Sequence, residues 1–93
     1  MAIRFTGRRM SGGQQHQHIV RLWWVNPSTG ETGDNTREYL VSWIEDQKGK
    51  AYTEDAAGNR ADVGVRKTTN GVKYLQSHAD GVWTNNLLAL PVK

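Results

Sequence analysis

Cysteine is absent from this sequence of 93 residues, and histidine occurs only three times. The absence of cysteine excludes a disulfide framework, thiol catalysis and a thiolate zinc site. With so few histidines, we predict no metal and no other cofactor. Four tryptophans and three tyrosines can supply buried area instead. The length is typical of one domain, so we expect a single domain over residues 1–93.

Long apolar runs are also absent. The longest ones, from Leu22 to Val25 and from Leu87 to Leu90, are far too short to cross a bilayer. The first five residues lack the apolar stretch of a secretory signal. We therefore expect a cytoplasmic protein with no membrane partner, bacterial or carried by a phage, that is a monomer or a small homo-oligomer.

Acidic residues are missing from the first 30 residues, which hold four arginines and a formal charge of +4. Residues 31–62 hold eight acids against four bases, and residues 63–93 return to +3. The net charge of +3 therefore hides a polarised distribution, which favours an anionic partner for one face. A solvated surface that keeps the protein dispersed explains the same distribution without a partner.

Alternation predicts a half-buried strand at the start of the chain. Ile3 and Phe5 point to one side of this strand. Arg4, Thr6 and Arg8 point to the other side.

Strands are also expected on both sides of one helix. The ranges that favour strands are 18–25, 50–54, 60–69, 72–76 and 82–90. The polar stretch 27–35 is interpreted as a loop. We therefore predict an α+β fold, in which a small antiparallel sheet in the order β-β-α-β-β-β carries one helix packed on one face.

The helix is predicted over 36–48. Asn35 or Thr36 can cap its first turn, and Gly49 suits a left-handed position just past its end. The apolar stripe at positions i, i+3 and i+4 consists of Leu40, Trp43 and Ile44. The stripe predicts that the helix covers the core.

Two dipeptides predict tight turns between strands. Asn70-Gly71 is typical of a type I′ hairpin, whose two central residues both need positive φ. Asp80-Gly81 is expected to form another turn near the C-terminal end.

The C-terminal part resembles the ending of a known family. The run Lys73-Tyr74-Leu75-Gln76-Ser77-His78-Ala79-Asp80-Gly81 is followed by Asn85-Asn86-Leu87-Leu88-Ala89-Leu90-Pro91. This pattern resembles a family of small bacterial and phage proteins catalogued as a domain of unknown function. The resemblance extends more weakly over nearly the whole chain, and it implies no particular activity.

This ending has a structural and a functional interpretation. In the structural one, the leucines fill the core, Asn85 or Asn86 binds free backbone, and Pro91 stops the chain from pairing further. The functional one is a ligand site, built from Tyr74, His78, Asp80 and Asn86.

A catalytic triad at this ending is not supported. Neighbours on a strand face opposite sides, so Ser77 cannot easily present its hydroxyl to His78. We therefore do not expect an enzyme.

Two further segments have open interpretations. The stretch Gly7–Gly13 combines glycines with arginines, and it is either a flexible hairpin loop or a cradle for a phosphate. His16 and His18 are interpreted as loop and strand-edge residues, because no carboxylate cluster accompanies them.

The best candidate site is a surface of arginines and tryptophans on the first two strands. Its residues are Arg4, Arg8, Arg9, Arg21, Trp23 and Trp24. Alternation along the second strand places either Arg21 and Trp23 or Trp24 on the open side. Arginine beside tryptophan suits base stacking and phosphate neutralisation. The same combination is enriched at the energetic centres of protein–protein interfaces.

Two functions therefore fit the sequence. The first is a non-catalytic module that recognises an anionic partner, nucleic acid or nucleotide, through the arginine and tryptophan surface. The alternative is a protein-binding module, including a phage-type inhibitor that occupies a surface of a host defence complex.

Overall fold

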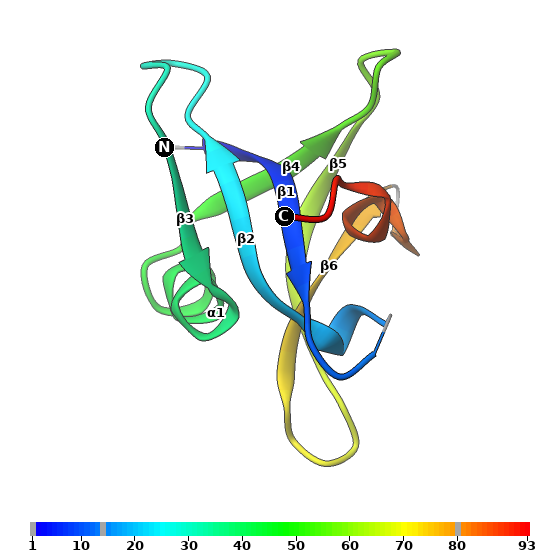
Figure 1. Cartoon of the computed structure of the whole chain (residues 1–93). Coiled ribbons are helices and arrows are strands. Elements are labelled where there is room, and N and C mark those ends of the chain that lie inside the picture. The colour runs from blue at the N-terminus through cyan, green and yellow to red at the C-terminus, as the bar shows by residue number, and fades with distance from the viewer. Residues whose placement is uncertain (1, 14, 80) are drawn as a thin grey trace.

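Seven strands of the computed structural model form one continuous sheet (Figure 1). The structure describes residues 2–13, 15–79 and 81–93. Over these residues the strands are β1 (Ala2–Met10), β2 (Ile19–Val25), β3 (Thr32–Thr36), β4 (Lys50–Glu54), β5 (Arg60–Lys67), β6 (Lys73–Ala79) and β7 (Val82–Thr84). The helical elements are α1 (Arg37–Asp46) and the 3-10 turns η1 (His16–His18) and η2 (Asn86–Ala89). The strand order is β3-β2-β1-β4-β5-β6-β7.

The expected fold class is wrong, because the sheet is neither small nor purely antiparallel. β1 and β4 are parallel neighbours, with Ile3 opposite Ala51 and Arg4 opposite Tyr52. The other neighbouring strands are antiparallel. The parallel pair arises because α1 carries the chain from the β3 edge to the far side of β1, and parallel strands need such a crossover. The described chain is thus mostly sheet, with one α-helix.

The two edge strands differ most from expectation. β3 lies within the stretch interpreted as a loop, and β7 covers only the first three residues of the strand expected over 82–90. Gly33, Asp34 and Asn35 disfavour strands intrinsically. They pair with β2 all the same, and Trp24 Nε1 donates to Asn35 Oδ1 at 2.8 Å. Contacts with β2 therefore form β3 against its own propensity.

The helix is confirmed, although it ends differently from the prediction. Thr36 caps it, because its hydroxyl accepts a hydrogen bond from Tyr39 N at 3.3 Å. Beyond the helix the left-handed residue is Lys48, with φ 54°, and not Gly49. Gly49 N donates to Trp43 O at 3.0 Å, which closes the last turn.

The core lies between α1, η2 and the inner face of the sheet. Its buried apolar side chains are Ile3, Phe5, Ile19, Leu22, Leu40, Val41, Ala51, Val63, Leu75 and Leu87. Leu88 and Leu90 pack against this cluster, which confirms that the C-terminal leucines belong to the core.

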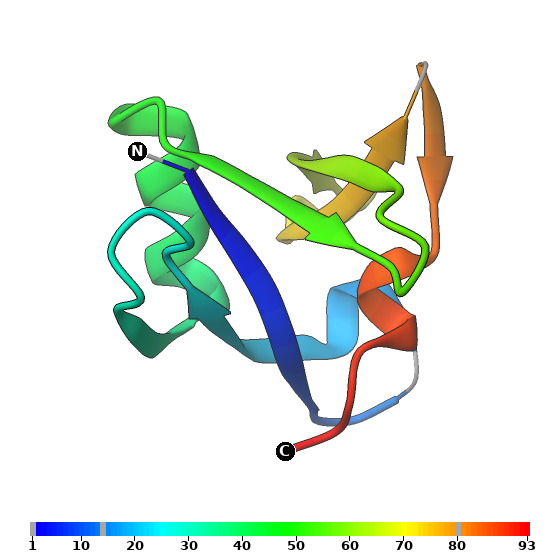
Figure 2. The same cartoon turned by 90° about the horizontal axis from the view of Figure 1, so that it is seen from above.

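β1 and β4 diverge after their first residues, and η2 lies at the open end between them (Figure 2). Beyond η2 the chain pairs with the second half of β1. Arg8 N donates to Pro91 O at 2.9 Å, and Lys93 N donates to Arg8 O at 2.8 Å. The prediction that Pro91 ends pairing is therefore wrong, because proline lacks only the donor and its carbonyl still accepts.

The hairpin between β5 and β6 is wider than the predicted type I′ turn. Gly71 has φ 88°, whereas Asn70 is not in the positive-φ region. Gly71 N donates to Thr68 O at 3.0 Å, and Thr68 N donates to Val72 O at 2.9 Å. Five residues therefore connect the strands, and only one of them needs glycine. Asp80, expected to start the next turn, lies outside the described residues.

Candidate functional site

One face of the sheet points away from the core and is called the outer face below. Ile3 and Phe5 are buried in the core, so Arg4 lies on the outer face, as predicted. A β-bulge then shifts the register between Phe5 and Gly7. Because one extra residue reverses the alternation of a strand, Arg8 turns inward and Arg9 turns outward.

A broad groove of about 580 Å³ crosses the outer face of β1, β2 and β3. Its polar and aromatic lining includes Arg4, Thr6, Trp23, Thr32, Asp34 and Lys93. The volume is in the range of about 300–1,000 Å³ that is usual for ligand sites, although this groove is open. The groove therefore offers room for a planar group beside positive charge.

Arg9 and Trp23 form a cation–π pair next to this groove. The guanidinium carbon of Arg9 lies 5.1 Å from the centre of the Trp23 ring. Arg9 also donates from Nε and Nη2 to the main-chain oxygen of Lys93, at 3.3 and 3.2 Å. Among the described residues no Asp or Glu side chain pairs with Arg9. The Trp23 ring and the bonds to Lys93 therefore orient its guanidinium group.

The other arginines of this region share few carboxylates. Arg21 forms an ion pair with Asp34 across β2 and β3. Glu54 accepts from Arg60 at 2.9 Å and from Arg4 at 3.4 Å. The hydrogen bond from Arg60, followed by its charge and by Arg4, lowers the pKa of Glu54. Two guanidinium groups share this carboxylate, so the outer face keeps an excess of positive charge.

Two of the six predicted site residues take different positions. Arg8 donates from Nε to Leu90 O at 3.0 Å, and its Nη1 is buried without a partner in the described part of the chain. Trp24 borders the groove, but it packs against the core. The structure therefore brings Arg4, Arg9, Arg21 and Trp23 together on the outer face, and it separates Arg8 from them.

Much of the Gly7–Gly13 stretch is paired backbone. Its first four residues belong to β1, where the amide of Arg8 is bound by Pro91 O. Ser11 N donates to His18 O at 3.0 Å. A cradle needs free amides, so the amides of Arg8 and Ser11 cannot contribute to one.

His16 is buried on η1, and its Nε2 has no hydrogen-bond partner within the described ranges. Burial, and secondly the charge of Arg66, lowers the pKa of His16. No group of three or more potential ligands close enough for a metal ion occurs among the residues described.

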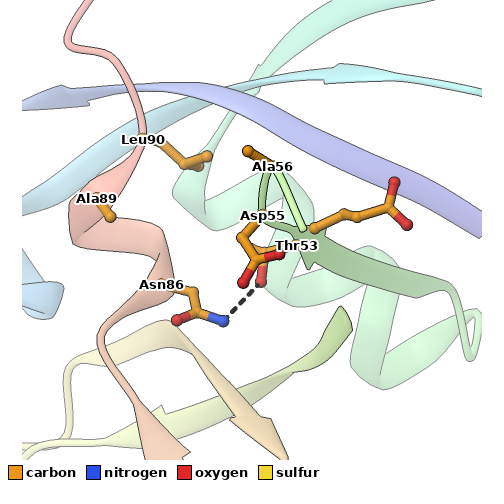
Figure 3. A pocket seen from close by; sticks show the side chains of 7 residues that line it. Thr53, Asp55, Ala56, Asn86, Ala89 and Leu90 are labelled. Atoms are coloured by element: carbon orange, nitrogen blue, oxygen red, sulfur yellow. Dashed lines mark hydrogen bonds between the residues drawn. The ribbon is translucent and has the colours of Figure 1, made fainter. Parts of the chain in front are cut away.

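A smaller pocket of about 280 Å³ lies between the end of β4 and η2 (Figure 3). Asn86 Nδ2 donates to Thr53 Oγ1 at 3.3 Å across it. Asp55 accepts from Ala57 N and Asn59 N, both at 2.9 Å, and hydrogen bonds from Asn59 lead those that lower its pKa. The carboxylate of Asp55 therefore stabilises the turn between β4 and β5.

The suggested C-terminal ligand site does not converge either. Asn86 contacts Thr53, which is buried, whereas His78 lies on the outer face of β6. Ser77 is fully buried and bonded to Thr84, so it points away from His78 as expected. Asp80, the fourth member of that suggested site, is outside the described residues.

Sequence reasoning missed an aromatic and cationic set on the other half of the outer face. Arg60 lies 4.6 Å from the Tyr52 ring, and Arg66 lies 4.6 Å from the Trp83 ring. The alternation of polar and apolar residues in β5 was a usable signal for the two arginines. No sequence signal marked Tyr52 and Trp83, because only strand pairing places them beside these arginines.

The chain is thus a small mixed-sheet protein with one helix behind the sheet and an outer face rich in arginine and aromatic residues. Residues 1–91 match the family described as "Protein of unknown function (DUF3892)", and the chain belongs to that family. The predicted membership of a small family of unknown function is therefore confirmed. No curated protein and no solved structure matches the chain. The described residues include no helix with the length and apolar character needed to span a membrane.

Proposed function

We propose that the protein is a non-catalytic binding module that recognises an anionic partner, nucleic acid or nucleotide, through its outer face. The observation that carries this proposal is Arg9, stacked on Trp23 beside the groove that Arg4 and Lys93 line. A nucleobase can stack on the indole while the arginines and the lysine neutralise its phosphates. The proposal places the protein in the cytoplasm.

The distribution of charge supports an anionic ligand for this face. The outer-face cations are Arg4, Arg9, Arg21, Lys50, Arg60 and Arg66, with Lys93 beside the groove. The acids of the same face are Asp34, Glu54 and Asp62. On the opposite side α1 carries one arginine and three acids. Cations therefore outnumber acids on the outer face.

Binding of labelled single-stranded DNA and RNA, followed by fluorescence anisotropy at low and moderate salt, tests the proposal. Affinity should fall steeply with salt, because bound arginines release counterions from phosphates. Trp23→Ala and Arg9→Ala should each lower affinity about tenfold or more, as loss of one stacking group does. Tyr39→Ala, an exposed aromatic on α1, and Lys67→Ala, a cation of the other face, are the matched controls. No binding at low salt contradicts the proposal.

A second candidate is a protein-binding module, including a bacterial or phage-encoded inhibitor of a host defence complex. Val82 and Trp83 favour it, because they are 63% and 40% exposed on the edge strand β7. Exposed apolar side chains on an edge strand are typical of a contact with another protein. A purified defence complex challenged with the wild type and with Val82→Asp tests this candidate. Equal activity of the complex with both variants contradicts it.

A further inference from the structure

All three cation–π pairs of the described residues lie on the outer face of the sheet. They are Arg9 with Trp23, Arg60 with Tyr52, and Arg66 with Trp83. Directly opposed residues of neighbouring strands point to the same face, so strand register decides this placement.

One row of opposed residues crosses the sheet from Arg4, which lines the groove, to Trp83. Arg4 on β1 is opposite Tyr52 on β4, and Tyr52 is opposite Asp62 on β5. Asp62 is opposite His78 on β6, which is opposite Trp83 on β7. The groove that Arg4 lines and the cluster at Trp83 therefore lie on the same face of the sheet, and the row between them includes the buried Tyr52.

The cluster at Trp83 is built in a fixed arrangement. The His78 ring meets the Trp83 ring edge-on, with centroids 5.1 Å apart and planes at 66°. Gly64 lies beside both rings, since a Cβ there would be 3.3 Å from Trp83 Cη2 and 3.4 Å from His78. A Cβ at this position would press both rings outward by a few tenths of an ångström, so the glycine lets them approach the sheet closely.

Arg66 is oriented by a short chain of hydrogen bonds. Its Nη1 donates to Gln76 Oε1 at 3.1 Å, and Gln76 Nε2 donates to Thr84 O at 3.1 Å. Arg66 has no carboxylate partner in the described part of the chain. A stacked guanidinium group without an acidic side-chain partner, beside an indole that is 40% exposed, repeats the arrangement of Arg9 and Trp23.

We infer that the ligand is an extended single-stranded nucleic acid, which reaches from the Arg9–Trp23 pair to the Arg66–Trp83 pair. The inference depends on the proposed function and specifies its ligand. Five strand spacings separate β2 from β7, a path of about 24 Å along the sheet. That path is longer than one nucleotide and suits a site of roughly four or more. The bases of a duplex are stacked on one another, so they cannot stack on Trp23 and on Trp83 at the same time.

Asp62 lies in the middle of the connecting row and is not in an ion pair among the described residues. A carboxylate beside a phosphate backbone weakens binding through repulsion. Removal of the Asp62 charge should therefore raise the affinity for a ligand that crosses the whole face. The affinity for a ligand confined to the Trp23 groove should stay the same.

The test is the affinity of labelled oligo-dT and oligo-rU of 3, 6, 12 and 18 nucleotides. Arg66→Ala and Trp83→Ala should lower affinity for the 12-mer about tenfold and leave the 3-mer unchanged. Arg9→Ala should lower affinity at every length, and Asp62→Asn should raise it for the long oligomers alone. Trp83→Phe, which keeps a ring, separates lost stacking from lost folding. Lys67→Ala is the charge control.

The outcomes separate this inference from the proposed function. If the oligomers bind but Arg66→Ala and Trp83→Ala behave as the wild type at every length, the ligand does not cross the face. The inference then fails and the proposed function stands. Equal losses at all lengths, or equally tight binding of duplex DNA, also overturn the inference. If no oligomer binds at any length, both fail.

Discussion

The indole of Trp43 lies directly against the main chain of Gly49, three residues beyond the end of α1. A Cβ on Gly49 would overlap the ring at its Cδ2 and Cε2 atoms. Trp43 itself packs against the core, so it has little freedom to move away. The glycine is therefore needed here for space, whereas the left-handed position belongs to Lys48.

Replacement of Gly49 by alanine should lower the free energy of unfolding by about 1–3 kcal/mol, as overpacking commonly does. Chemical denaturation followed by circular dichroism measures the change. In a Trp43→Leu background, where the ring is gone, the added cost of alanine should shrink to a small fraction. An equal cost in both backgrounds contradicts the contact.

Arg8 and Arg9 are neighbours with opposite roles, so alanine should affect them differently. Arg8→Ala should lower the free energy of unfolding by about 1–3 kcal/mol, because it removes the charged hydrogen bond to Leu90 O. Oligonucleotide affinity should stay at the wild-type value. Arg9→Ala should lower oligonucleotide affinity and change the free energy of unfolding by less than about 0.5 kcal/mol. The same effect for both variants, in thermal unfolding and anisotropy, contradicts the β-bulge assignment.

His16 should make stability depend on pH on the acid side of neutrality. Burial lowers its pKa below the ordinary value of 6.5, so the folded state binds this proton less readily than the unfolded state. The stability is therefore complete above about pH 6.5 and declines as the pH falls below it, until the folded-state pKa is passed. Urea unfolding between pH 7.5 and about 5 measures the slope.

The matched variants are His16→Phe and His18→Gln. His16→Phe should abolish the slope, because it removes the titrating imidazole. It also removes the buried Nε2 that has no partner in the described residues. His18→Gln should keep the slope, since His16 is still present. Persistence of the slope in His16→Phe would assign it to another group.

The loop between β5 and β6 should tolerate alanine at one position and reject it at the next. Gly71→Ala should cost about 1–2 kcal/mol, because Gly71 has φ 88° and a side chain is strained there. Asn70→Ala should be nearly neutral. Equal costs at both positions, measured by thermal unfolding, would favour the type I′ turn after all.

Local patterns predicted the helix and the first strand well. The stripe of Leu40, Trp43 and Ile44 and the alternation of Ile3 with Phe5 depend only on neighbours in sequence, and both lead into the core. The candidate surface was predicted in part, because simple alternation placed Arg4 correctly and failed at Arg8. A β-bulge depends on the partner strand and is not visible in one strand's own pattern.

The sequence by itself determined that Arg4 lies on the face opposite Ile3 and Phe5, and that one amphipathic helix would cover a sheet. Periodicity is enough for such statements, since it assigns side chains to faces. Only the tertiary structure decided which strands are neighbours, that β4 runs parallel to β1, and that Trp83 shares a face with Trp23. Pairing between distant segments depends on the packing of the whole chain, which no local pattern contains.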